Sequence, residues 1–505
     1  MAKKSKKVAS EADCRQYECH FPQVDCIDLQ QVVEMMNPLV KKRFGDIWRL
    51  TNNVSPTDIA ISNPMLCTKA DAEQAVSNGL AVQLPKGTPI TCNAFSVLET
   101  KLNPKRIRRR PIQWAKRFNE LCEEKGYKAQ VDLKHHSNYF QRCNNQTGAT
   151  FDLKAGFFQI PLGSHNLFTF ADEEGNIFGL KRLPMGICTA PEIMQLVTSA
   201  IAGDPTIVQP KFAVKAVVDV WIDNVLFSGS SEKVSAAVAN FKRVTAKTKT
   251  TINWHEAEEG STLDFIGMHY DFQAHTIGMS NKNRAKIVDM SFANNMLVSE
   301  LETNTARLMY ASSVMAVPLS SYYFALKFIR RKLSEINRET ITRNDMVHVS
   351  PSALKAFTNW KRDVLLRSAR TLPSEEGRRT FTLWTDASNI GWGAVLIDNL
   401  TQQVRIVADK WSEEDALSHI NILEAKAVRY ALERFGGIEG SVIQPRIDNT
   451  SVVWSVAKGY SRSQDINEEI ATVQRVCNDK GILLKAPIYV RSKDNIADRW
   501  SRYFD

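Results

Sequence analysis

Four acidic side chains near the C-terminus have the types and spacing of a divalent-metal site, and each lies in its own phrase. They are Asp386 in TFTLWTDASNIGWGAVL, Glu424 in NILEAKAVRYALERFG, Asp448 in SVIQPRIDNTSVVW and Asp498 in VRSKDNIADRWSR. Carboxylates brought close together repel and lose hydration, so such a cluster requires hard cations. Two Mg²⁺ ions can activate a water and stabilise the leaving 3′ oxygen of a phosphodiester. Any one of these acids alone would be read as a surface carboxylate, but the four together predict a two-metal cleavage site.

The elements that must position these acids follow from the surrounding pattern. TFTLWTD and WGAVLID predict two antiparallel strands around the turn 387–391, with Asp386 at the end of the first. ILEAKAVRYALERFGG predicts an amphipathic helix that ends at Gly436–Gly437 and turns Glu424 inward. SVIQPRID predicts a strand ending in Asp448, KAPIYVRS predicts another strand, and Asp498 opens the last helix. The apolar stripe of the amphipathic helix consists of Ile422, Ala425, Val428 and Leu432.

This C-terminal region resembles the RNase H of reverse-transcribing retroelements. The resemblance covers residues 381–505 and is carried by the phrases LWTDAS…GWGAVL, E-A-x-A, DN and DNxADxxSR. It implies an RNase H-like α/β fold in which all four acids are catalytic metal ligands. One departure is that no histidine lies in the loop before Asp498. Arg491 and Lys493 occupy that stretch instead, so product release is expected to differ.

Three upstream phrases resemble the polymerase motifs of reverse transcriptases. TFDLKAGFFQIPL (150–162) resembles the first motif, LPMGICTAPEIMQ (183–195) the second, and VWIDNVLFSG (220–229) takes the place of the Y-x-D-D hairpin. Asp152 at a strand end and Asp223 at a hairpin turn can meet across adjacent strands. Phosphoryl transfer requires paired metals held by carboxylates, so both are expected to bind Mg²⁺, or Mn²⁺ in its place, with two ions per active site.

The resemblance also implies roles for single positions around the incoming nucleotide. The backbone carbonyl of Leu153 would contact a metal, and the ring of Phe157 would exclude a ribose 2′-OH. Arg110, nine residues before Asn119, corresponds to the finger arginine that binds the triphosphate. The segment beneath the nucleotide and template base would comprise Pro184, Met185 and Gly186. Ordinary core packing is the competing interpretation for Phe157 and for that segment.

The polymerase motifs depart from the family in three places. Asn224 stands where the family has a second catalytic aspartate, so that Asn224 would coordinate metal without supplying charge. Trp221 replaces the usual tyrosine. No lysine follows Asn253 to serve as general acid, and His255 is the nearest substitute. The expected set of nuclease carboxylates is therefore complete, whereas the expected set of polymerase residues is altered.

The charge of the chain indicates the class of its binding partner, and its cysteine content indicates the redox environment. The net charge is +10 with a pI near 9.0, which favours a polyanionic partner. The basic segment KLNPKRIRRRP (101–111) predicts phosphate contacts in preference to a solvated loop. Nine cysteines without a secretion signal indicate reduced thiols. Four N-terminal residues do not match the usual zinc spacings, so zinc is not assigned to them: Cys14, Cys19, His20 and Cys26.

The chain has the length for several domains, and composition shifts predict their bounds. We expect a multidomain α+β and α/β protein, a right-hand polymerase of fingers, palm and thumb/connection followed by an RNase H-like domain. The predicted ranges are a polar segment at 1–30, fingers and palm at 31–280, a helical thumb/connection at 281–370, a linker at 371–380 and the RNase H domain at 381–505.

The predicted function is RNA-directed DNA polymerisation combined with cleavage of the RNA strand of the hybrid. DAEQAVSNGLAVQ resembles the helix and turn that open the fingers of reverse transcriptases, and FIGMHYD resembles the segment that leads to the primer grip. SSVMAVPL followed by PSALKAFTNWKRDVL resembles the thumb and connection of tyrosine-recombinase retrotransposons, among which the DIRS-like elements, and VIPER of trypanosomatids in particular, match best. The implied partners are an RNA template, a DNA primer, the RNA–DNA hybrid and dNTPs. Two alternatives stay open: a domesticated nucleic-acid scaffold, which Asn224 favours, and an enzyme that retains only the nuclease.

No stretch of apolar residues has the length of a membrane span, so no membrane partner is expected. The N-terminal MAKKSKKVASEAD has charge but no apolar core, which argues against secretion and favours a flexible tail over a nuclear signal. These features favour the cytoplasm or the nucleus. The sequence indicates no oligomeric state.

Overall fold

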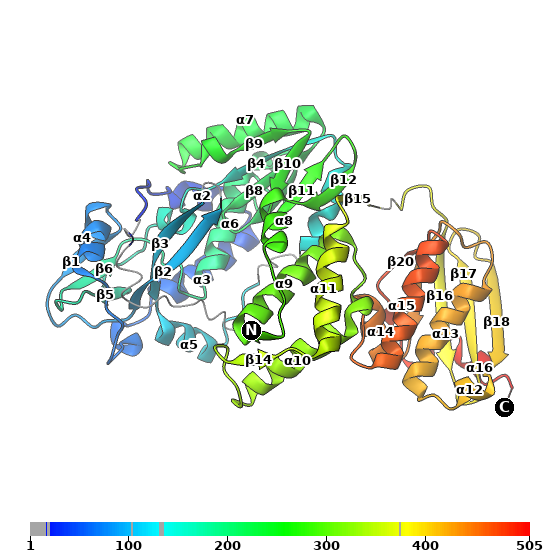
Figure 1. Ribbon diagram of the computed structural model, residues 1–505. Helices are drawn as coiled ribbons and strands as arrows, with labels where there is room; N and C mark the ends of the chain where they lie inside the picture. The colour runs from blue at the N-terminus through cyan, green and yellow to red at the C-terminus, as the bar shows by residue number, and fades with distance from the viewer. Residues whose placement is uncertain (1–16, 18–20, 103–104, 131–135, 373–374, 505) are drawn as a thin grey trace. The chain divides into compact units, whose positions relative to one another are not determined.

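The structure is a computed structural model that describes residues 17, 21–102, 105–130, 136–372 and 375–504 (Figure 1). Its contacts divide the chain into two compact units, Met1–Lys282 and Asn283–Asp505. Helices and strands alternate in both units, which confirms the expected mixed α and β, multidomain organisation. Among the described residues, no helix has both the length and the apolar character needed to cross a membrane.

The helices of the first unit surround small antiparallel sheets. Its α-helices are α2 (Leu29–Met35), α3 (Pro38–Asn52), α4 (Lys69–Ser77), α5 (Lys116–Glu124), α6 (Ala190–Ala202) and α7 (Ser231–Lys247). Its 3₁₀ turns are η1 (Pro56–Ile59), η2 (His136–Asn144), η3 (Gly156–Gln159), η4 (Pro210–Phe212) and η5 (Trp254–Glu256). Helix α8 (Asn281–Val288) carries the chain into the second unit.

Within the described part of the first unit the strands form four groups. One sheet has the order β1-β6-β5, with β1 (Ala81–Leu84), β5 (Thr169–Ala171) and β6 (Ile177–Leu180). A long hairpin pairs β2 (Asn93–Leu102) with β3 (Lys105–Trp114). A sheet of order β7-β8-β4-β9 contains β4 (Thr147–Asp152), β7 (Val217–Trp221), β8 (Asn224–Gly229) and β9 (Glu258–Gly260). A meander joins β10 (Thr262–Phe265), β11 (Met268–Asp271) and β12 (Thr276–Met279).

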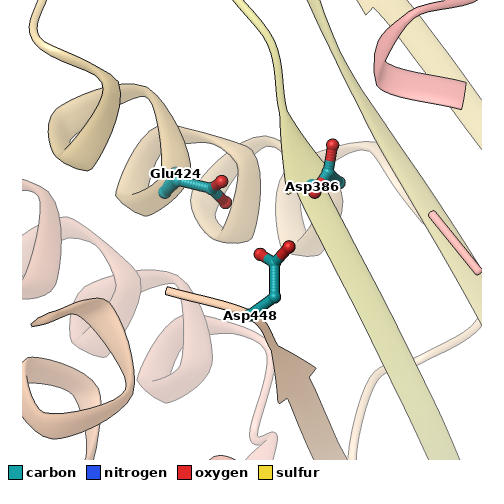
Figure 2. A group of neighbouring side chains, drawn as sticks. All are labelled: Asp386, Glu424 and Asp448. Carbon is teal, nitrogen blue, oxygen red and sulfur yellow. The ribbon is translucent and has the colours of Figure 1, made fainter. Parts of the chain in front are cut away.

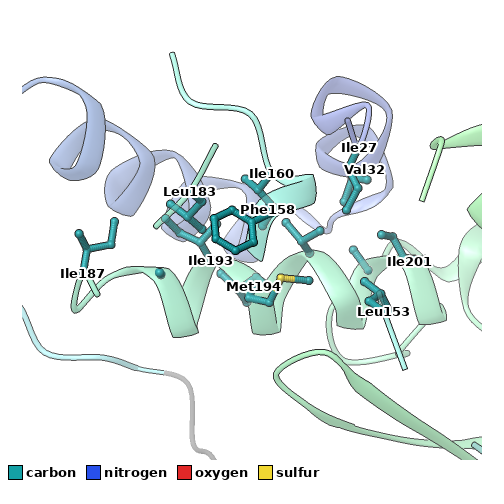
Figure 3. Packing of buried hydrophobic residues seen from close by; sticks show 14 of the residues in the cluster. Ile27, Val32, Leu153, Phe158, Ile160, Leu183, Ile187, Ile193, Met194 and Ile201 are labelled. Carbon is teal, nitrogen blue, oxygen red and sulfur yellow. The ribbon is translucent and has the colours of Figure 1, made fainter. Parts of the chain in front are cut away.

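Helix α6 is the centre of the first unit's core. Nearly every side chain along it is buried, as expected for a mainly apolar helix at the centre of a core. Pro191 stands in its first turn, and Gly203 ends it in the left-handed conformation at φ +74°. Figure 3 shows Ile193 and Met194 of this helix packed beside Phe158. The phrase LPMGICTAPEIMQ thus leads directly into the buried helix that supports the four-stranded sheet.

The second unit begins with a mainly helical stretch. Its elements are β13 (Asn295–Leu297), α9 (Val298–Met315), η6 (Leu319–Tyr322), α10 (Tyr323–Asn337), β14 (Met346–His348), α11 (Pro351–Leu365) and β15 (Ala369–Thr371). Trp360 of α11 is fully buried, stacks on Tyr322 and donates from its indole nitrogen to Ser312 at 2.6 Å. Helices α9 and α11 are therefore joined by a satisfied polar contact inside an apolar core.

A mixed six-stranded sheet follows, with the order β18-β17-β16-β19-β20 and β21 also paired to β19. Its strands are β16 (Thr380–Ala387), β17 (Gly391–Asp398), β18 (Val404–Lys410), β19 (Val442–Ile447), β20 (Leu483–Leu484) and β21 (Ile488–Tyr489). Its helices are α12 (Glu413–Ala416), α13 (Ile420–Arg434), α14 (Thr450–Lys458), α15 (Gln464–Asp479) and α16 (Asp498–Ser501), with η7 at Ser492–Asp494.

Alternation along β16 explains how this sheet is covered. Phe381, Leu383 and Thr385 are buried, while Thr382 and Trp384 on the opposite face are half-exposed. Helix α13 packs on β16, β17 and α15 through its buried stripe (Figure 1). The predicted stripe residues Ala425, Val428 and Leu432 are fully buried, whereas Ile422 is half-buried. The predicted hairpin turn, helix and strands of this region are present, although the strand in KAPIYVRS comprises only Ile488–Tyr489.

Candidate functional site

Three of the four C-terminal acids converge at one end of the six-stranded sheet. Asp386 is the next-to-last residue of β16, and Asp448 directly follows β19. These strands are parallel neighbours with Thr385 opposite Ile447, so the two acids extend side by side beyond the last paired residues. Glu424 approaches from the first turns of α13. Figure 2 shows the three side chains pointing toward one another, and their ligand oxygens all lie within 4.8 Å of one another.

Burial and mutual repulsion disfavour the charged forms of this triad. Asp386 is 3% exposed and Glu424 is 5% exposed. Burial raises the pKa of Glu424 to about 9, and the negative charges of Asp386 and Asp448 add to the effect. Burial likewise raises the pKa of Asp386 to about 7, reinforced by Asp448 and Asp498 and opposed by a hydrogen bond from Ser501. A bound divalent cation would reverse this preference by stabilising the carboxylate forms.

Two buried oxygens of the triad fit such a cation. Within the described residues, Glu424 Oε2 and Asp448 Oδ1 are buried and accept no hydrogen bond from the protein. Buried carboxylate oxygens are normally satisfied, so an unsatisfied pair facing a third carboxylate has the character of a ligand set. Carboxylate oxygens are the donors that Mg²⁺ and Mn²⁺ prefer. The triad therefore fits a hard divalent metal.

The fourth acid, Asp498, lies close to the triad but outside the group within 4.8 Å. It is the first residue of α16, as predicted, and its carboxylate pairs with Arg502 at 3.1 Å. Its charge nevertheless raises the pKa of both Asp386 and Glu424. The negative charge of Asp498 thus affects the triad electrostatically, while its carboxylate forms a salt bridge with Arg502 in the same short segment.

Two residues that the sequence analysis did not single out contact Asp386 directly. Asn495 donates from Nδ2 to Asp386 Oδ1 at 3.2 Å, and the Ser501 hydroxyl donates to Asp386 Oδ2. Both belong to the phrase DNxADxxSR that carries Asp498. Their presence in that phrase was the only available signal, because a chain position does not reveal which strand a side chain reaches.

Gly393 of β17 allows the segment with Asp498 to pack flat on the sheet. A Cβ at this position would lie 2.6 Å from the Ser501 nitrogen and 2.6 Å from the Trp500 carbonyl carbon. Such distances are far below van der Waals contact, so a larger residue would displace α16. The G-W-G of the second strand is therefore a packing requirement of the site.

A second candidate site occupies a cavity of about 430 Å³ in the first unit. Strands β4 and β8 are antiparallel, with Asp152 opposite Asn224, and the Leu153 N–H donates to the Asp223 carbonyl at 2.9 Å. Strand pairing thus brings the two predicted metal-binding aspartates to one wall. Of the predicted site residues, the cavity is lined by Arg110, Asp152, Leu153, Phe157, Met185 and Asp223.

Two other predicted substrate residues, Pro184 and Gly186, do not line this cavity. Pro184 is buried, and a Cβ on Gly186 would lie 2.1 Å from the Gln113 carbonyl oxygen of β3. Asn119 holds the loop by donating to the Gly186 carbonyl at 3.0 Å and accepting from the Cys188 N–H at 2.7 Å. The structure thus places Met185 at the site, Gly186 against β3 and Pro184 in the interior.

The altered hairpin has a defined hydrogen-bond pattern. Asn224 donates from Nδ2 to Asp223 Oδ1 at 3.1 Å, and burial is the main cause that raises the pKa of Asp223. Asn253 donates to Asp152 Oδ2 in a similar way. Each aspartate is therefore held by a carboxamide. His255, the suggested substitute for a general-acid lysine, is exposed on the cavity wall.

The turn that carries Asp223 is fixed from outside. Ile222 has φ +60°, a left-handed conformation that β-branched residues strongly disfavour. Gln195 of α6 bonds the turn at two points, donating to the Val220 carbonyl at 2.9 Å and accepting from the Ile222 N–H at 2.6 Å. Helix α6 therefore dictates the conformation of the hairpin.

The basic segment is a strand, not a loop, and its arginines differ in role. Strand β3 places Arg109 against Asp71 in a buried ion pair, so the expectation that this arginine contacts phosphate was wrong. Adjacent side chains of a strand face opposite sides, and Arg110 accordingly lines the cavity. The side chains at 101–106 and at 108 lie outside the described residues, as do Cys14, Cys19 and His20. The seven described cysteines form no disulfide within the described part of the chain.

No protein-family model matches the chain, and no curated protein matches it. Solved structures resemble it over most of its length. One is the foamy viral protease-reverse transcriptase in complex with RNA/DNA hybrid, with a TM-score of 0.49, 13% identity, and coverage of 94% of this chain and 65% of that chain. The same protein in complex with dsDNA gives a TM-score of 0.46 at 13% identity, with coverage of 93% of this chain and 99% of that chain. The dRH form of that protein, in complex with ds DNA, gives a TM-score of 0.48 at 13% identity. That comparison covers 95% of this chain and 85% of the other chain.

Proposed function

We propose that the chain is an RNA-directed DNA polymerase with RNase H activity. The observation that carries the proposal is the triad of Asp386, Glu424 and Asp448, which offer one carboxylate oxygen each within 4.8 Å of one another. Two buried oxygens of the triad, Glu424 Oε2 and Asp448 Oδ1, also have no hydrogen-bond donor among the described residues. The palm-like cavity supports the polymerase half, since it joins Asp152, Asp223 and the cationic Arg110. Two phosphoryl-transfer sites in one chain fit the copying of RNA into DNA followed by removal of the template.

For the nuclease, the triad would hold Mg²⁺, or Mn²⁺ in its place, with Asp498 alongside and two ions in the complete site. The metal would supply Lewis-acid stabilisation of the phosphodiester and a more acidic water. The protein's own contribution is to hold three acids together against their repulsion. Asn495 and Ser501 hold Asp386, while the strand pairing of β16 and β19 sets the spacing to Asp448.

For the polymerase, Asp152 and Asp223 would hold the ions, with the Leu153 carbonyl and Asn224 as neutral oxygen ligands. Arg110 supplies positive charge for the triphosphate of a dNTP. Phe157 lines the same cavity and would bar a ribose 2′-OH by its bulk. Met185 forms part of the wall on which the nucleotide and template base would rest. The RNA template, DNA primer and RNA–DNA hybrid would be bound through backbone phosphates and 2′-hydroxyls.

The domain assignment belongs to this proposal. Fingers and palm would comprise 31–280, the thumb/connection 281–370 and the RNase H domain 381–505, with 1–30 as an N-terminal segment and 371–380 as a linker. The stretch SSVMAVPL followed by PSALKAFTNWKRDVL supports a source in a DIRS-like tyrosine-recombinase element such as VIPER. An enzyme of this kind would act in the cytoplasm or the nucleus.

The test uses the full chain in two parallel assays, primer extension on an RNA template and cleavage of labelled RNA in an RNA–DNA hybrid, with Mg²⁺ or Mn²⁺. Asp152→Asn should abolish extension and spare cleavage, whereas Asp386→Asn should do the reverse, each by about a hundredfold or more. Asp479→Asn, at an exposed position on α15, is the matched control and should change neither.

One alternative has a specific observation in its favour. Asn224 leaves the palm with two described carboxylates where the family has three, which favours a degenerate polymerase site, either in a nucleic-acid scaffold or in an enzyme that retains only the nuclease. Hybrid cleavage without extension at any metal concentration would establish that alternative. Loss of both activities in the wild-type chain would instead indicate a nucleic-acid scaffold.

A further inference from the structure

The segment that carries Asp498 donates a hydrogen bond to each carboxylate oxygen of Asp386, the first acid of the triad. Asn495 Nδ2 lies 3.2 Å from Asp386 Oδ1, and the Ser501 hydroxyl donates to Asp386 Oδ2. All three side chains are buried. No other carboxylate of the triad is held in this way by side chains of the described residues, since Glu424 Oε2 and Asp448 Oδ1 have no protein donor.

Each of the two donors is itself fixed to the sheet. Asn495 also donates to the Thr385 carbonyl at 3.0 Å and accepts from the Ala497 N–H at 3.1 Å, so its carboxamide has one orientation. The Ser501 carbonyl accepts from the Ser388 hydroxyl at 2.8 Å. These bonds attach the segment to the hairpin formed by β16 and β17. The donors are therefore preorganised and do not depend on a ligand for their position.

The Ser501 hydroxyl has a choice between two acceptors. It lies 2.8 Å from the Asp498 carbonyl oxygen as well as beside Asp386 Oδ2, and one hydroxyl carries one hydrogen. An ionised carboxylate is the stronger acceptor of the two. When Asp386 is ionised, as a metal ligand must be, the hydroxyl is expected to turn toward it.

We propose that Ser501 and Asn495 are positioning residues that orient the Asp386 carboxylate for divalent-metal binding. A carboxylate oxygen has two lone-pair directions, and one protein donor on each oxygen leaves one direction on each for metal. Rotation of the carboxylate would break both hydrogen bonds. The same short segment bears Asp498, so its docking places the first and the fourth acid together. The inference rests on the proposed nuclease function.

The test compares Ser501→Ala and Ser501→Cys with Ser388→Ala in the full chain. Alanine removes the donor and cysteine keeps the volume with a much weaker donor. Ser388→Ala is the matched control, because that hydroxyl supports the same segment but does not contact Asp386. Mn²⁺ binding is followed by electron paramagnetic resonance in an Asp152→Asn/Asp223→Asn background, which removes the palm carboxylates. Thermal unfolding is measured on every variant.

We expect both Ser501 variants to weaken Mn²⁺ binding about tenfold and to raise the Mg²⁺ concentration for half-maximal hybrid cleavage by a similar factor. The KM for hybrid should stay within about twofold, as expected for a change confined to a metal ligand. Ser388→Ala should lower the unfolding temperature and weaken Mn²⁺ binding by much less than either Ser501 variant, because it removes one support of the segment but leaves both donors to Asp386 in place. Asn495→Ala should weaken Mn²⁺ binding in the same direction.

Unchanged Mn²⁺ affinity in both Ser501 variants would overturn the inference, as would a loss that Ser388→Ala reproduces in full. These outcomes are separate from failure of the proposed function. If the wild-type chain binds Mn²⁺ but cleaves no hybrid, the nuclease proposal fails. The Mn²⁺ affinities of the Ser501 variants still decide whether this hydroxyl orients the ligand.

Discussion

Arg109 and Asp71 form a buried, two-point ion pair that joins strand β3 to helix α4. The guanidinium contacts both carboxylate oxygens, one of them at 2.9 Å, and the two residues are 7% and 5% exposed. Removing one partner of such a pair leaves an uncompensated buried charge. Arg109→Ala should therefore lower the free energy of unfolding by about 3–5 kcal/mol in chemical denaturation. The double variant Arg109→Met/Asp71→Leu should recover most of the loss, and a double variant as unstable as Arg109→Ala would contradict this explanation.

The neighbouring Arg110 should behave in the opposite way. Its side chain lines the cavity with Asp152 and Asp223, and its charge lowers the pKa of Asp223 against the dominant effect of burial. Arg110→Ala should leave the unfolding free energy nearly unchanged and raise the KM for dNTP about tenfold or more, since a charge-assisted contact to phosphate is lost. Steady-state primer extension measures this. A pure loss of stability in Arg110→Ala would show that both arginines are structural.

Phe157 is predicted to select the sugar of the incoming nucleotide. Its ring is half-buried in the wall of the cavity that Asp223 also lines, and a smaller side chain would open that wall. Phe157→Val should raise ribonucleotide incorporation relative to deoxyribonucleotide incorporation by about tenfold or more. The ratio of kcat/KM for dCTP and CTP measures the effect. An unchanged ratio, with extension intact, would assign this ring to core packing.

Asn224→Asp should increase primer extension severalfold in Mg²⁺. The carboxamide now donates to Asp223 and contributes no charge, whereas a carboxylate would add a charged metal ligand. Asn224→Ala is the control, because it removes the hydrogen bond without adding charge. Lower activity in Asn224→Asp than in the wild type would show that this palm has adapted to the neutral residue.

The triad predicts an unusual pH dependence of stability in the absence of metal. The pKa of Glu424 is raised from 4.5 to about 9, and that of Asp386 from 3.8 to about 7. The folded state thus binds these protons more tightly than the unfolded chain does. Their stabilisation is complete below the unfolded pKa values and is lost as pH rises through 7 and 9. In EDTA, the unfolding temperature should fall across this range.

Glu424→Gln provides the control for that prediction, because an amide carries no titrating proton. Its unfolding temperature in EDTA should depend less on pH than that of the wild type. Mg²⁺ should stabilise the wild type more at pH 8 than at pH 5.5, since metal binding requires ionised carboxylates. Differential scanning fluorimetry measures both. Identical pH profiles for the wild type and Glu424→Gln would show that this carboxylate is already ionised in the folded protein.

Much of the proposed nuclease site follows from local sequence. Alternation around Asp386 fixed the strand and its buried face, and the apolar stripe of the helix around Glu424 fixed its inward direction. These are short-range patterns with one strong period. The order of β16 and β19 in the sheet is a long-range property, and so is the approach of Ser501 to Asp386. No local period encodes either of them.

The proposed polymerase site was less predictable for a similar reason. Strand pairing explains why Asp152 and Asp223 meet, and the motifs indicated both. The run of charge in the basic segment predicted phosphate contacts, but a run of charge does not show which arginine meets a buried partner within the protein. Arg109 can be buried because its charge is paired with Asp71, which lies 38 residues away in the chain. Gly186 was predicted to bind substrate. In the structure, its lack of a Cβ allows the Gln113 carbonyl oxygen to lie close to it.

The hydrogen bonds of Gln195 to the turn at Ile222 have a consequence for how this protein can be tuned. A turn whose own residues disfavour its conformation relaxes once the external support is withdrawn. The geometry of Asp223 is thus under the control of a helix that begins more than thirty residues earlier in the chain and carries none of the proposed metal ligands. Substitutions on α6 are therefore expected to silence the proposed DNA synthesis while every acid stays in place and the proposed nuclease keeps working.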